Sequence, residues 1–183
     1  YPGARFDSES WSYGYSFSQD LLDEWDWTEN FAPQPETEQY LNLVADKFDL
    51  RRDIQFSARV SSAHFDDGSR LWTLTLEDGS RHTTRYLISA VGPLSAPTYP
   101  KLDGLDDFQG EAWHTGLWPK HEVDFSGKRV AVIGTGASAV QAIPIIAETA
   151  GHLTVFQRRP NWCTPLHNAQ INRQEMAEIR ARY

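Results

Sequence analysis

The stretch VAVIGTGASAVQAI, residues 130–143, decides the fold of this 183-residue chain. An apolar run ends at Ile133, a glycine-rich turn follows, and a second apolar run begins at Val140. This layout predicts a strand, a tight turn and a helix start, the arrangement that binds the pyrophosphate of a dinucleotide. The first glycine allows the turn, the second brings backbone close to phosphate oxygens, and the small third residue lets helix and strand pack. The predicted pyrophosphate site consists of Gly134, Thr135, Gly136, Ala137, Ser138, Ala139 and Val140.

The next apolar segment, HLTVF at residues 152–156, is predicted to be the second strand of the same βαβ unit. An NAD site normally has an acidic residue at the end of this strand, against the ribose 2′-hydroxyl. Here Arg158 and Arg159 occupy that place, and no carboxylate is near them in the sequence. Two guanidinium groups suit a 2′-phosphate, so the pattern predicts an NADP(H) site. The alternative is a solvated basic turn.

Length and composition set outer limits on the class of protein. At 183 residues, with 40% hydrophobic and 23% charged residues, the chain is predicted to be one globular domain or pieces of two. No apolar run approaches the ~18 residues of a membrane span, and no signal peptide pattern is present. The net charge of −8 disfavours nucleic acid as the main partner. Cys163 is the only cysteine, which excludes an intrachain disulfide and fits a cytoplasmic location.

The first ninety residues predict a loop, a helix and a meander of strands. Residues 1–34 have no sustained period and predict a loop with short helical turns, with Trp25 and Trp27 packed beneath it. A 3- and 4-residue apolar spacing predicts an amphipathic helix from Pro35 to about Leu50. Turn signals then divide three predicted strands, at 54–65, 71–76 and 81–91, the last of which is expected to enter a buried sheet.

A region rich in proline and glycine, residues 93–119, predicts a linker, and a further helix is expected from Arg173. We therefore predict three parts: residues 1–92 as the C-terminal part of one domain, 93–127 as an interdomain linker, and 128–183 as the N-terminal part of a dinucleotide-binding domain. Because the chain begins at Tyr1 without methionine, it is expected to be an internal fragment.

The linker carries a family resemblance. Residues 108–119, FQGEAWHTGLWP, match the pattern FxGxxxHxxxWP, which is the fingerprint of type I Baeyer–Villiger monooxygenases. The segments YPGARFD at 1–7 and FQRRP at 156–160 extend the match. The whole chain resembles the interior of such a flavin monooxygenase. The signature residues are Phe108, Gly110, His114, Trp118 and Pro119.

The resemblance implies an α/β fold with two Rossmann-like dinucleotide-binding domains, only part of each being present here. One domain would bind FAD and the other NADP(H). The implied reaction inserts one oxygen atom of O2 into a small-molecule ketone through a C4a-peroxyflavin, giving an ester or lactone. The alternatives are an N-hydroxylating or sulfoxidising relative and an inert NADP-binding fragment. The family's FAD-binding GxGxxG and its active-site arginine have no counterpart in these residues, so the fragment alone is predicted to be inactive.

The resemblance also implies roles for individual residues. Asp7 would lie near the flavin and nicotinamide, where it orients an active-site arginine and is the catalytic residue of this segment. On residue type alone, Asp7 would be a turn or helix-cap aspartate. Arg5 and Phe6 would line the nicotinamide side of NADP and Tyr13 the flavin side. Val60 would contact FAD through its backbone, a strand-core valine being the alternative.

His114 of the signature could have either of two roles. His114 has the side-chain chemistry of a general base. We favour a hinge role, with its ring hydrogen-bonded to backbone where the linker meets the NADP-binding part. The other histidines lack metal-ligand spacing, so no metal site is predicted.

Overall fold

The computed structural model describes residues 1–92 and 94–183. Pro93, the first residue of the predicted linker, lies outside the described residues. The chain forms two compact units, which are described separately. The first unit comprises residues 1–47 and 97–183, and the second comprises residues 48–96.

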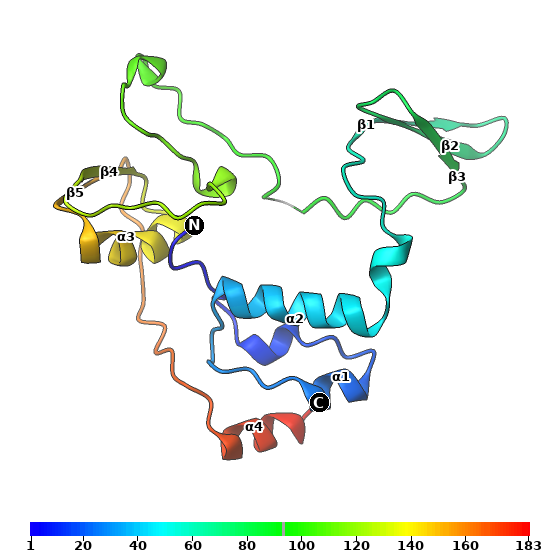
Figure 1. Ribbon diagram of the computed structural model, residues 1–183, viewed down its shortest axis with the longest axis horizontal. Helices are drawn as coiled ribbons and strands as arrows, with labels where there is room; N and C mark the ends of the chain where they lie inside the picture. Colours follow the sequence, from blue (N-terminus) through cyan, green and yellow to red (C-terminus); the bar gives the residue numbers. More distant parts are fainter. Residues whose placement is uncertain (93) are drawn as a thin grey trace. The chain divides into compact units, whose positions relative to one another are not determined.

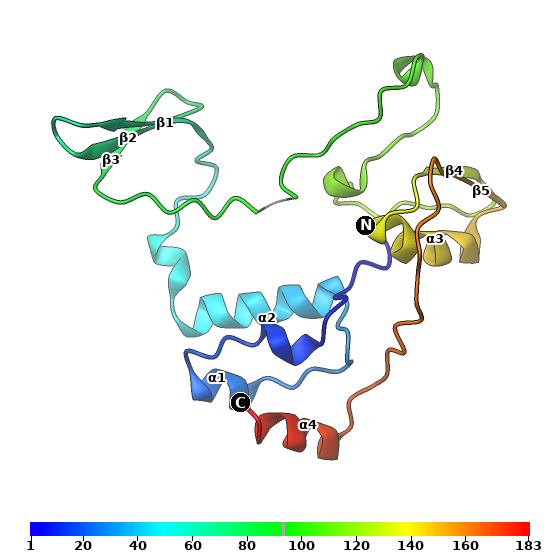
Figure 2. The ribbon, with the colours of Figure 1, turned by 180° about the vertical axis from the view of Figure 1, so that it is seen from behind.

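The predicted βαβ unit is confirmed in the first compact unit. Strand β4 (Arg129–Ile133) leads into helix α3 (Ala137–Thr149), which returns to strand β5 (His152–Phe156). The two strands pair in parallel from Arg129 opposite His152 to Ile133 opposite Phe156 (Figures 1 and 2). Helix α3 buries Ala142 and Ile146, which stand one helical turn apart and form one apolar face. The crossover places the glycine-rich turn at the carboxyl end of β4.

The same unit contains a group of helices built largely from the first 47 residues. The 3₁₀ turn η1 (Ser10–Tyr13) and the short helix α1 (Gln19–Glu24) confirm the predicted short helical turns. Helix α2 (Gln34–Lys47) confirms the predicted amphipathic helix, and α4 (Arg173–Arg180) confirms the C-terminal one. Helix α2 ends at Lys47, before the predicted Leu50. Asp49 adopts a φ of 49°, a left-handed conformation that a helix of L-residues does not continue through.

An aromatic cluster forms the core of this helical group. Trp27 and Tyr40 are almost fully buried, with ring centroids 5.1 Å apart, and Trp25 packs 5.8 Å from Trp27 and 5.3 Å from Tyr40. Leu21 of α1 and Met176 of α4 are buried as well. The prediction that the two tryptophans are packing residues is therefore confirmed. Large rings contribute most of the apolar area that such a small core buries.

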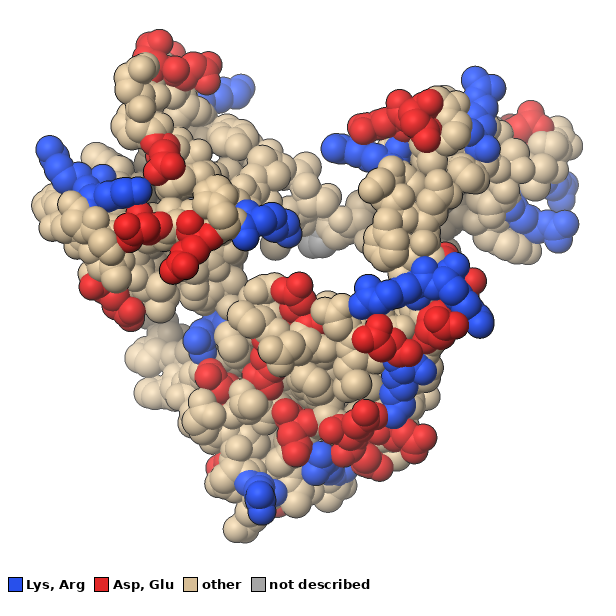
Figure 3. All heavy atoms as spheres, in the orientation of Figure 1, with Lys and Arg blue, Asp and Glu red and all other residues tan. Residues whose placement is uncertain are grey.

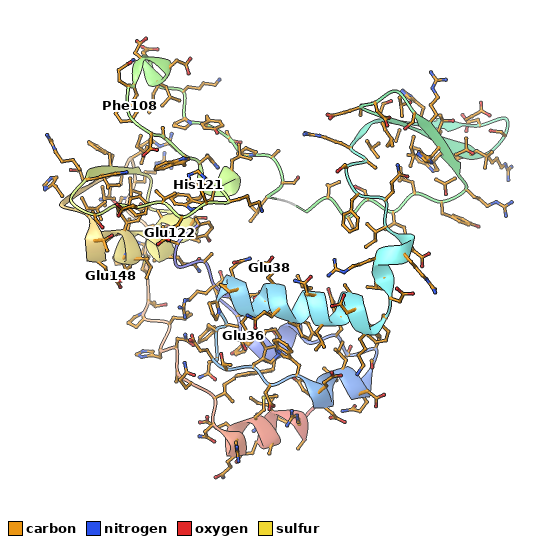
Figure 4. All side chains as sticks on the ribbon, viewed as in Figure 1. Glu36, Glu38, Phe108, His121, Glu122 and Glu148 are labelled. Carbon is orange, nitrogen blue, oxygen red and sulfur yellow. The ribbon has the colours of Figure 1, made fainter. Side chains whose placement is uncertain are left out.

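Two buried polar side chains hold the loop that precedes α2. Ser10 is fully buried, and its hydroxyl accepts a 2.7 Å hydrogen bond from the Ala32 N–H. Glu36, in the first turn of α2, accepts hydrogen bonds from the Thr28 N–H at 2.7 Å and the Thr28 hydroxyl at 2.6 Å. Figure 4 labels Glu36 and Glu38 on α2; Glu36 is buried, whereas Glu38 is exposed. These bonds satisfy polar groups that would otherwise be costly to bury.

The second unit is an antiparallel meander. It consists of a 3₁₀ turn η2 (Leu50–Asp53) and strands β1 (Val60–Asp66), β2 (Leu71–Leu76) and β3 (Arg81–Thr84), in the sheet order β1-β2-β3. The middle strand agrees with its predicted range. The first strand begins at Val60 and not at Ile54, because Ser57 adopts a φ of 54°, which is incompatible with extended backbone.

The prediction that the last strand of the meander runs to Val91 and enters a buried sheet is wrong for this chain. Strand β3 stops at Thr84, and the apolar residues after it are exposed, Tyr86 by 78%, Ile88 by 89% and Val91 by 76%. A strand needs a hydrogen-bonding neighbour, and within residues 1–92 and 94–183 no strand lies beside residues 85–91. The residues after β3 are apolar as the sequence shows, but no sheet that would bury them forms among the described residues.

The segment between the meander and β4 has little regular structure. It contains only two 3₁₀ turns among its described residues, η3 (Leu105–Asp107) and η4 (Thr115–Leu117).

Figure 3 shows acidic side chains gathered over the helical group around α1 and α2. This agrees with the sequence, in which residues 1–50 contain eleven acidic and two basic side chains.

Candidate dinucleotide site

The glycine-rich turn between β4 and α3 is open above its backbone. Gly134 adopts a φ of 108°, which favours glycine, and its N–H donates to the Phe156 carbonyl at 2.8 Å. A Cβ atom built on Gly134 or Gly136 would meet no atom within 4 Å. No side chain caps α3 at Gly136, so the first N–H groups of the helix remain available. The turn therefore fits a pyrophosphate, which N–H groups and the positive end of a helix dipole bind.

The two predicted arginines lie at the same edge of the sheet as this turn. Because Ile133 pairs with Phe156, residues 157–159 leave β5 beside the residues that leave β4. The Thr135 hydroxyl donates to the Arg159 carbonyl at 3.4 Å and so links the two segments. Arg158 and Arg159 are exposed, and neither guanidinium forms an ion pair with the described part of the chain. Two unpaired cations beside an open anion-binding turn suit a ribose 2′-phosphate.

The N-terminal segment packs against both α3 and the loop before α2. The Phe6 N–H donates to the Ala32 carbonyl at 3.0 Å, and the backbone N–H of Gln34 donates to the Ala4 carbonyl at 2.9 Å. The Phe6 ring stacks on Tyr13, with centroids 3.7 Å apart and an interplanar angle of 1°. The structure thus brings together two residues that the resemblance assigned to the nicotinamide and flavin sides.

Asp7 follows this paired segment and is exposed to solvent. Its carboxylate makes no hydrogen bond or ion pair with residues 1–92 or 94–183. Val60 begins β1 in the second unit, pairs with Leu76 and is 49% exposed. The described parts of the chain therefore place Asp7 and Tyr13 in one unit and Val60 in the other.

The linker signature forms local contacts. His114 Nδ1 accepts a 3.0 Å hydrogen bond from the Gly116 N–H, so its ring is bonded to backbone at the start of η4. A Cβ on Gly110 would lie 2.5 Å from the Phe108 ring, so a larger residue there would displace this exposed ring. Trp118, followed by Pro119, packs 5.9 Å from Trp113 and 6.3 Å from Phe125, measured between ring centroids.

A cavity of about 440 Å³ lies between this part of the linker and α3. Trp118 forms part of its wall, together with Tyr1, Ile145 and three ionisable side chains that Figure 4 labels, His121, Glu122 and Glu148. None of the described residues forms a group of three or more ligands that could hold a metal ion. No described helix has the length and apolarity needed to cross a membrane.

Two contact-rich residues were not predicted from the sequence. The Gln141 side chain, on α3, bonds to the backbone of Arg5, and the Glu29 carboxylate bonds to the Arg5 guanidinium. No local pattern marks either residue, because the partners are separated by 136 and 24 positions in the chain.

Comparison with known proteins places this geometry among flavoenzymes. The chain is 50% identical to 2-oxo-Δ3-4,5,5-trimethylcyclopentenylacetyl-CoA monooxygenase of Pseudomonas putida over 100% of this chain and 35% of that protein. It is 45% identical to acetone monooxygenase (methyl acetate-forming) of Gordonia sp. over 100% of this chain and 34% of the relative. It is also 44% identical to phenazine N-monooxygenase PhzNO1 of Lysobacter antibioticus over 98% of this chain and 33% of that protein. The chain thus spans about a third of the length of these curated relatives.

A solved structure has the same fold. The crystal structure of OTEMO in complex with FAD and NADP superposes with a TM-score of 0.93 at 50% identity, covering 100% of this chain and 35% of that one. This likeness confirms the predicted α/β fold class of the flavin monooxygenases. Residues 15–171 match the family described as flavin-binding monooxygenase-like. The chain belongs to that family of flavin-binding monooxygenases.

Proposed function

We propose that the protein is an FAD- and NADPH-dependent Baeyer–Villiger monooxygenase. It would convert a ketone, O2, NADPH and a proton into an ester or lactone, NADP⁺ and water, one oxygen atom entering the ketone and the other leaving as water. The observation that carries this proposal is the open turn at Gly134–Gly136 beside the unpaired Arg158 and Arg159. It occurs in a chain that matches an acetone monooxygenase over all of this chain and 34% of that relative.

The turn and the arginines would hold NADPH at two points. The N–H groups at the start of α3 would bind the pyrophosphate over residues 134–140, and the helix dipole would add to this attraction. Arg158 would bind the 2′-phosphate through charge-assisted hydrogen bonds, and Arg159 would support it. Arg5 and Phe6 would lie on the nicotinamide side. The assignment of the turn and the two arginines is supported by the pairing of Ile133 with Phe156, because both segments leave the same edge of the βαβ unit.

Fewer residues of this chain are assigned to FAD than to NADPH. When bound, FAD supplies the oxygen-activating chemistry, and the protein holds and orients it and excludes water. Tyr13 would face the flavin and Val60 would contact FAD through its backbone. Asp7 would orient an arginine supplied by another part of the protein. Its exposed carboxylate, which has no partner among the described residues, is available for such a pair.

We also propose the domain division 1–92, 93–127 and 128–183, with the FAD-binding part first, the linker second and the NADP-binding part last. His114 would act as a hinge residue of the linker. The bond from the Gly116 N–H to its ring supports this role, because it occupies Nδ1 and fixes the imidazole against the turn that follows.

The test is ketone-dependent consumption of NADPH by the protein that the complete reading frame encodes. We expect a yellow protein that oxidises NADPH faster when a ketone is added and forms one ester or lactone per NADPH. NADPH oxidation that yields no ester or lactone from any ketone would refute the proposal. A phenazine substrate is the informative second arm, because one relative is named as a phenazine N-monooxygenase. An N-oxide as the main product would favour that second function.

A further inference from the structure

The Gln141 side chain binds both backbone polar groups of Arg5. Its Nε2 donates to the Arg5 carbonyl at 3.0 Å, and its Oε1 accepts from the Arg5 N–H at 3.4 Å. The same Oε1 accepts a 2.9 Å hydrogen bond from the Tyr1 hydroxyl. The amide therefore occupies the place that a neighbouring strand would take beside Arg5. A residue of α3 thus fixes the position of a backbone segment 136 residues away in sequence.

Gly3 brings this segment into direct contact with the helix. It adopts a φ of 73°, and a Cβ built on it would lie 2.3 Å from the Gln141 carbonyl oxygen. Only glycine allows so close an approach. Tyr1, Gly3 and Arg5 therefore surround one residue of α3.

The Arg5 side chain is held from another direction. Its Nη1 donates to the Glu29 carboxylate at 3.0 Å, and Glu29 also accepts hydrogen bonds from the Asn168 and Gln170 side-chain amides. The segment around Asn168 follows β5, and the Asn30 N–H donates to the Ala169 carbonyl at 2.9 Å. Arg5 is therefore connected to the helix before β5 and to the chain after it.

We propose that Gln141 is a positioning residue that fixes the Asp7-bearing segment relative to the glycine-rich turn. Gln141 directly follows Val140, which lies in the first turn of α3 and is the last residue of the predicted pyrophosphate site, and Arg5 stands two residues before Asp7. An amide that binds both backbone groups of Arg5 determines where that segment lies along α3. This inference rests on the proposed function, because it assigns the contact to alignment of the nicotinamide side with the phosphate site.

The alternative is that the contact only stabilises the fold. The two readings differ in what they predict for binding and turnover. A contact that aligns the two segments lowers turnover and leaves affinity for the phosphate end of the coenzyme unchanged, since the turn and Arg158 remain in place. A contact that only stabilises the fold lowers the midpoint temperature and leaves turnover of the folded enzyme unchanged.

The experiment uses the full-length enzyme with Gln141→Met, which keeps the volume and removes both hydrogen bonds to Arg5. A second variant, Gln141→Glu, keeps the acceptor and loses the donor. Glu148→Gln is the matched control, because Glu148 is an exposed residue of the same helix. Hydrogen–deuterium exchange at the Arg5 amide reports the contact itself, independently of activity. NADPH oxidation at saturating NADPH and the Kd of 2′,5′-ADP report its consequence.

We expect exchange at Arg5 to accelerate about tenfold in Gln141→Met, as loss of a partly buried hydrogen-bond pair implies. Turnover should fall about tenfold or more, with the Kd of 2′,5′-ADP changed less than about twofold and Gln141→Glu intermediate. Unchanged exchange, or faster exchange with unchanged turnover, would overturn the proposal. An unsubstituted enzyme that oxidises no NADPH would instead refute the proposed function, and exchange at Arg5 would still show whether the contact exists.

Discussion

At the scale of single residues, two kinds of polar side chain matter most: exposed ones without a hydrogen-bond partner and buried ones that are fully hydrogen-bonded. The Asp7 carboxylate is exposed and unpaired within the described residues, whereas the Ser10 hydroxyl is buried and bonded. An exposed acidic group with no local contact is free to serve a partner from elsewhere. A buried hydroxyl with a bonded N–H stabilises the fold. Although the two residues are three positions apart, we expect replacement of Asp7 to change activity and replacement of Ser10 to change stability.

Replacing Asp7 by alanine in the full-length enzyme should lower ketone oxygenation about 100-fold, because the arginine that it orients would lose its fixed direction. The protein should keep its midpoint temperature, since the Asp7 side chain has no contact to lose within the described chain. Product yield per NADPH is the measurement. Near-normal oxygenation in this variant would reject the role of Asp7.

Replacing Ser10 by alanine should lower the free energy of unfolding by about 1–3 kcal/mol, because the buried Ala32 N–H loses its acceptor. Urea denaturation measures this change. Ser12→Ala is the control, since Ser12 is exposed and its hydroxyl donates to the Glu9 carbonyl, three residues earlier in the chain. Equal changes in the free energy of unfolding for the two variants would show that the buried position of Ser10 adds nothing to stability.

At the scale of elements, the sequence predicted those whose signals are local. The βαβ unit was predicted because Gly134, Gly136 and the apolar runs around them lie close together in the sequence, and the helix expected from Arg173 is observed as α4. The strand expected at residues 85–91 depended on a neighbour, which a local pattern does not report. The start of β1 was misplaced because the left-handed Ser57 has no signature in sequence.

The turn between β2 and β3 has a testable pH dependence. The Ser80 hydroxyl donates to the Asp78 carboxylate at 2.6 Å and the Ser80 N–H at 2.9 Å, and these bonds lower the pKa of Asp78 below its usual 3.8. A lowered pKa in the folded state means that this contribution is present above about pH 3.8 and is lost as the pH falls through the lowered pKa.

In Ser80→Ala, the pKa of Asp78 should rise toward its usual value, since the strongest of these bonds is removed. The Asp78 carboxyl resonance followed by NMR across acidic pH measures the shift. Ser61→Ala is the control, because the Ser61 hydroxyl bonds to the Thr75 carbonyl and not to Asp78. A pKa of Asp78 that stays the same in Ser80→Ala would show that the hydroxyl does not stabilise the carboxylate.

At the scale of the whole molecule, the sequence identified the family and predicted a set of candidate site residues, but it did not predict the contacts that connect them. Gly134, Arg158 and Asp7 were found from motifs, and the structure places the first two at one edge of a parallel sheet. Gln141 and Glu29 were missed because their partner, Arg5, lies far away in sequence and only folding brings them together. Contacts of this kind depend on the tertiary structure and leave no periodic pattern.

The central claim is that the glycine-rich turn and the start of α3, residues 134–140, together with Arg158, hold a 2′-phosphorylated coenzyme. The most direct measurement is the Kd of 2′,5′-ADP for the full-length protein and for Arg158→Ala, by titration calorimetry, with Arg173→Ala as a control at the start of α4. We predict that Arg158→Ala weakens binding about 10- to 100-fold, as loss of a charge-assisted hydrogen bond implies, and that binding of 5′-AMP is unaffected. Equal affinity of the unsubstituted protein and Arg158→Ala for 2′,5′-ADP would contradict this account.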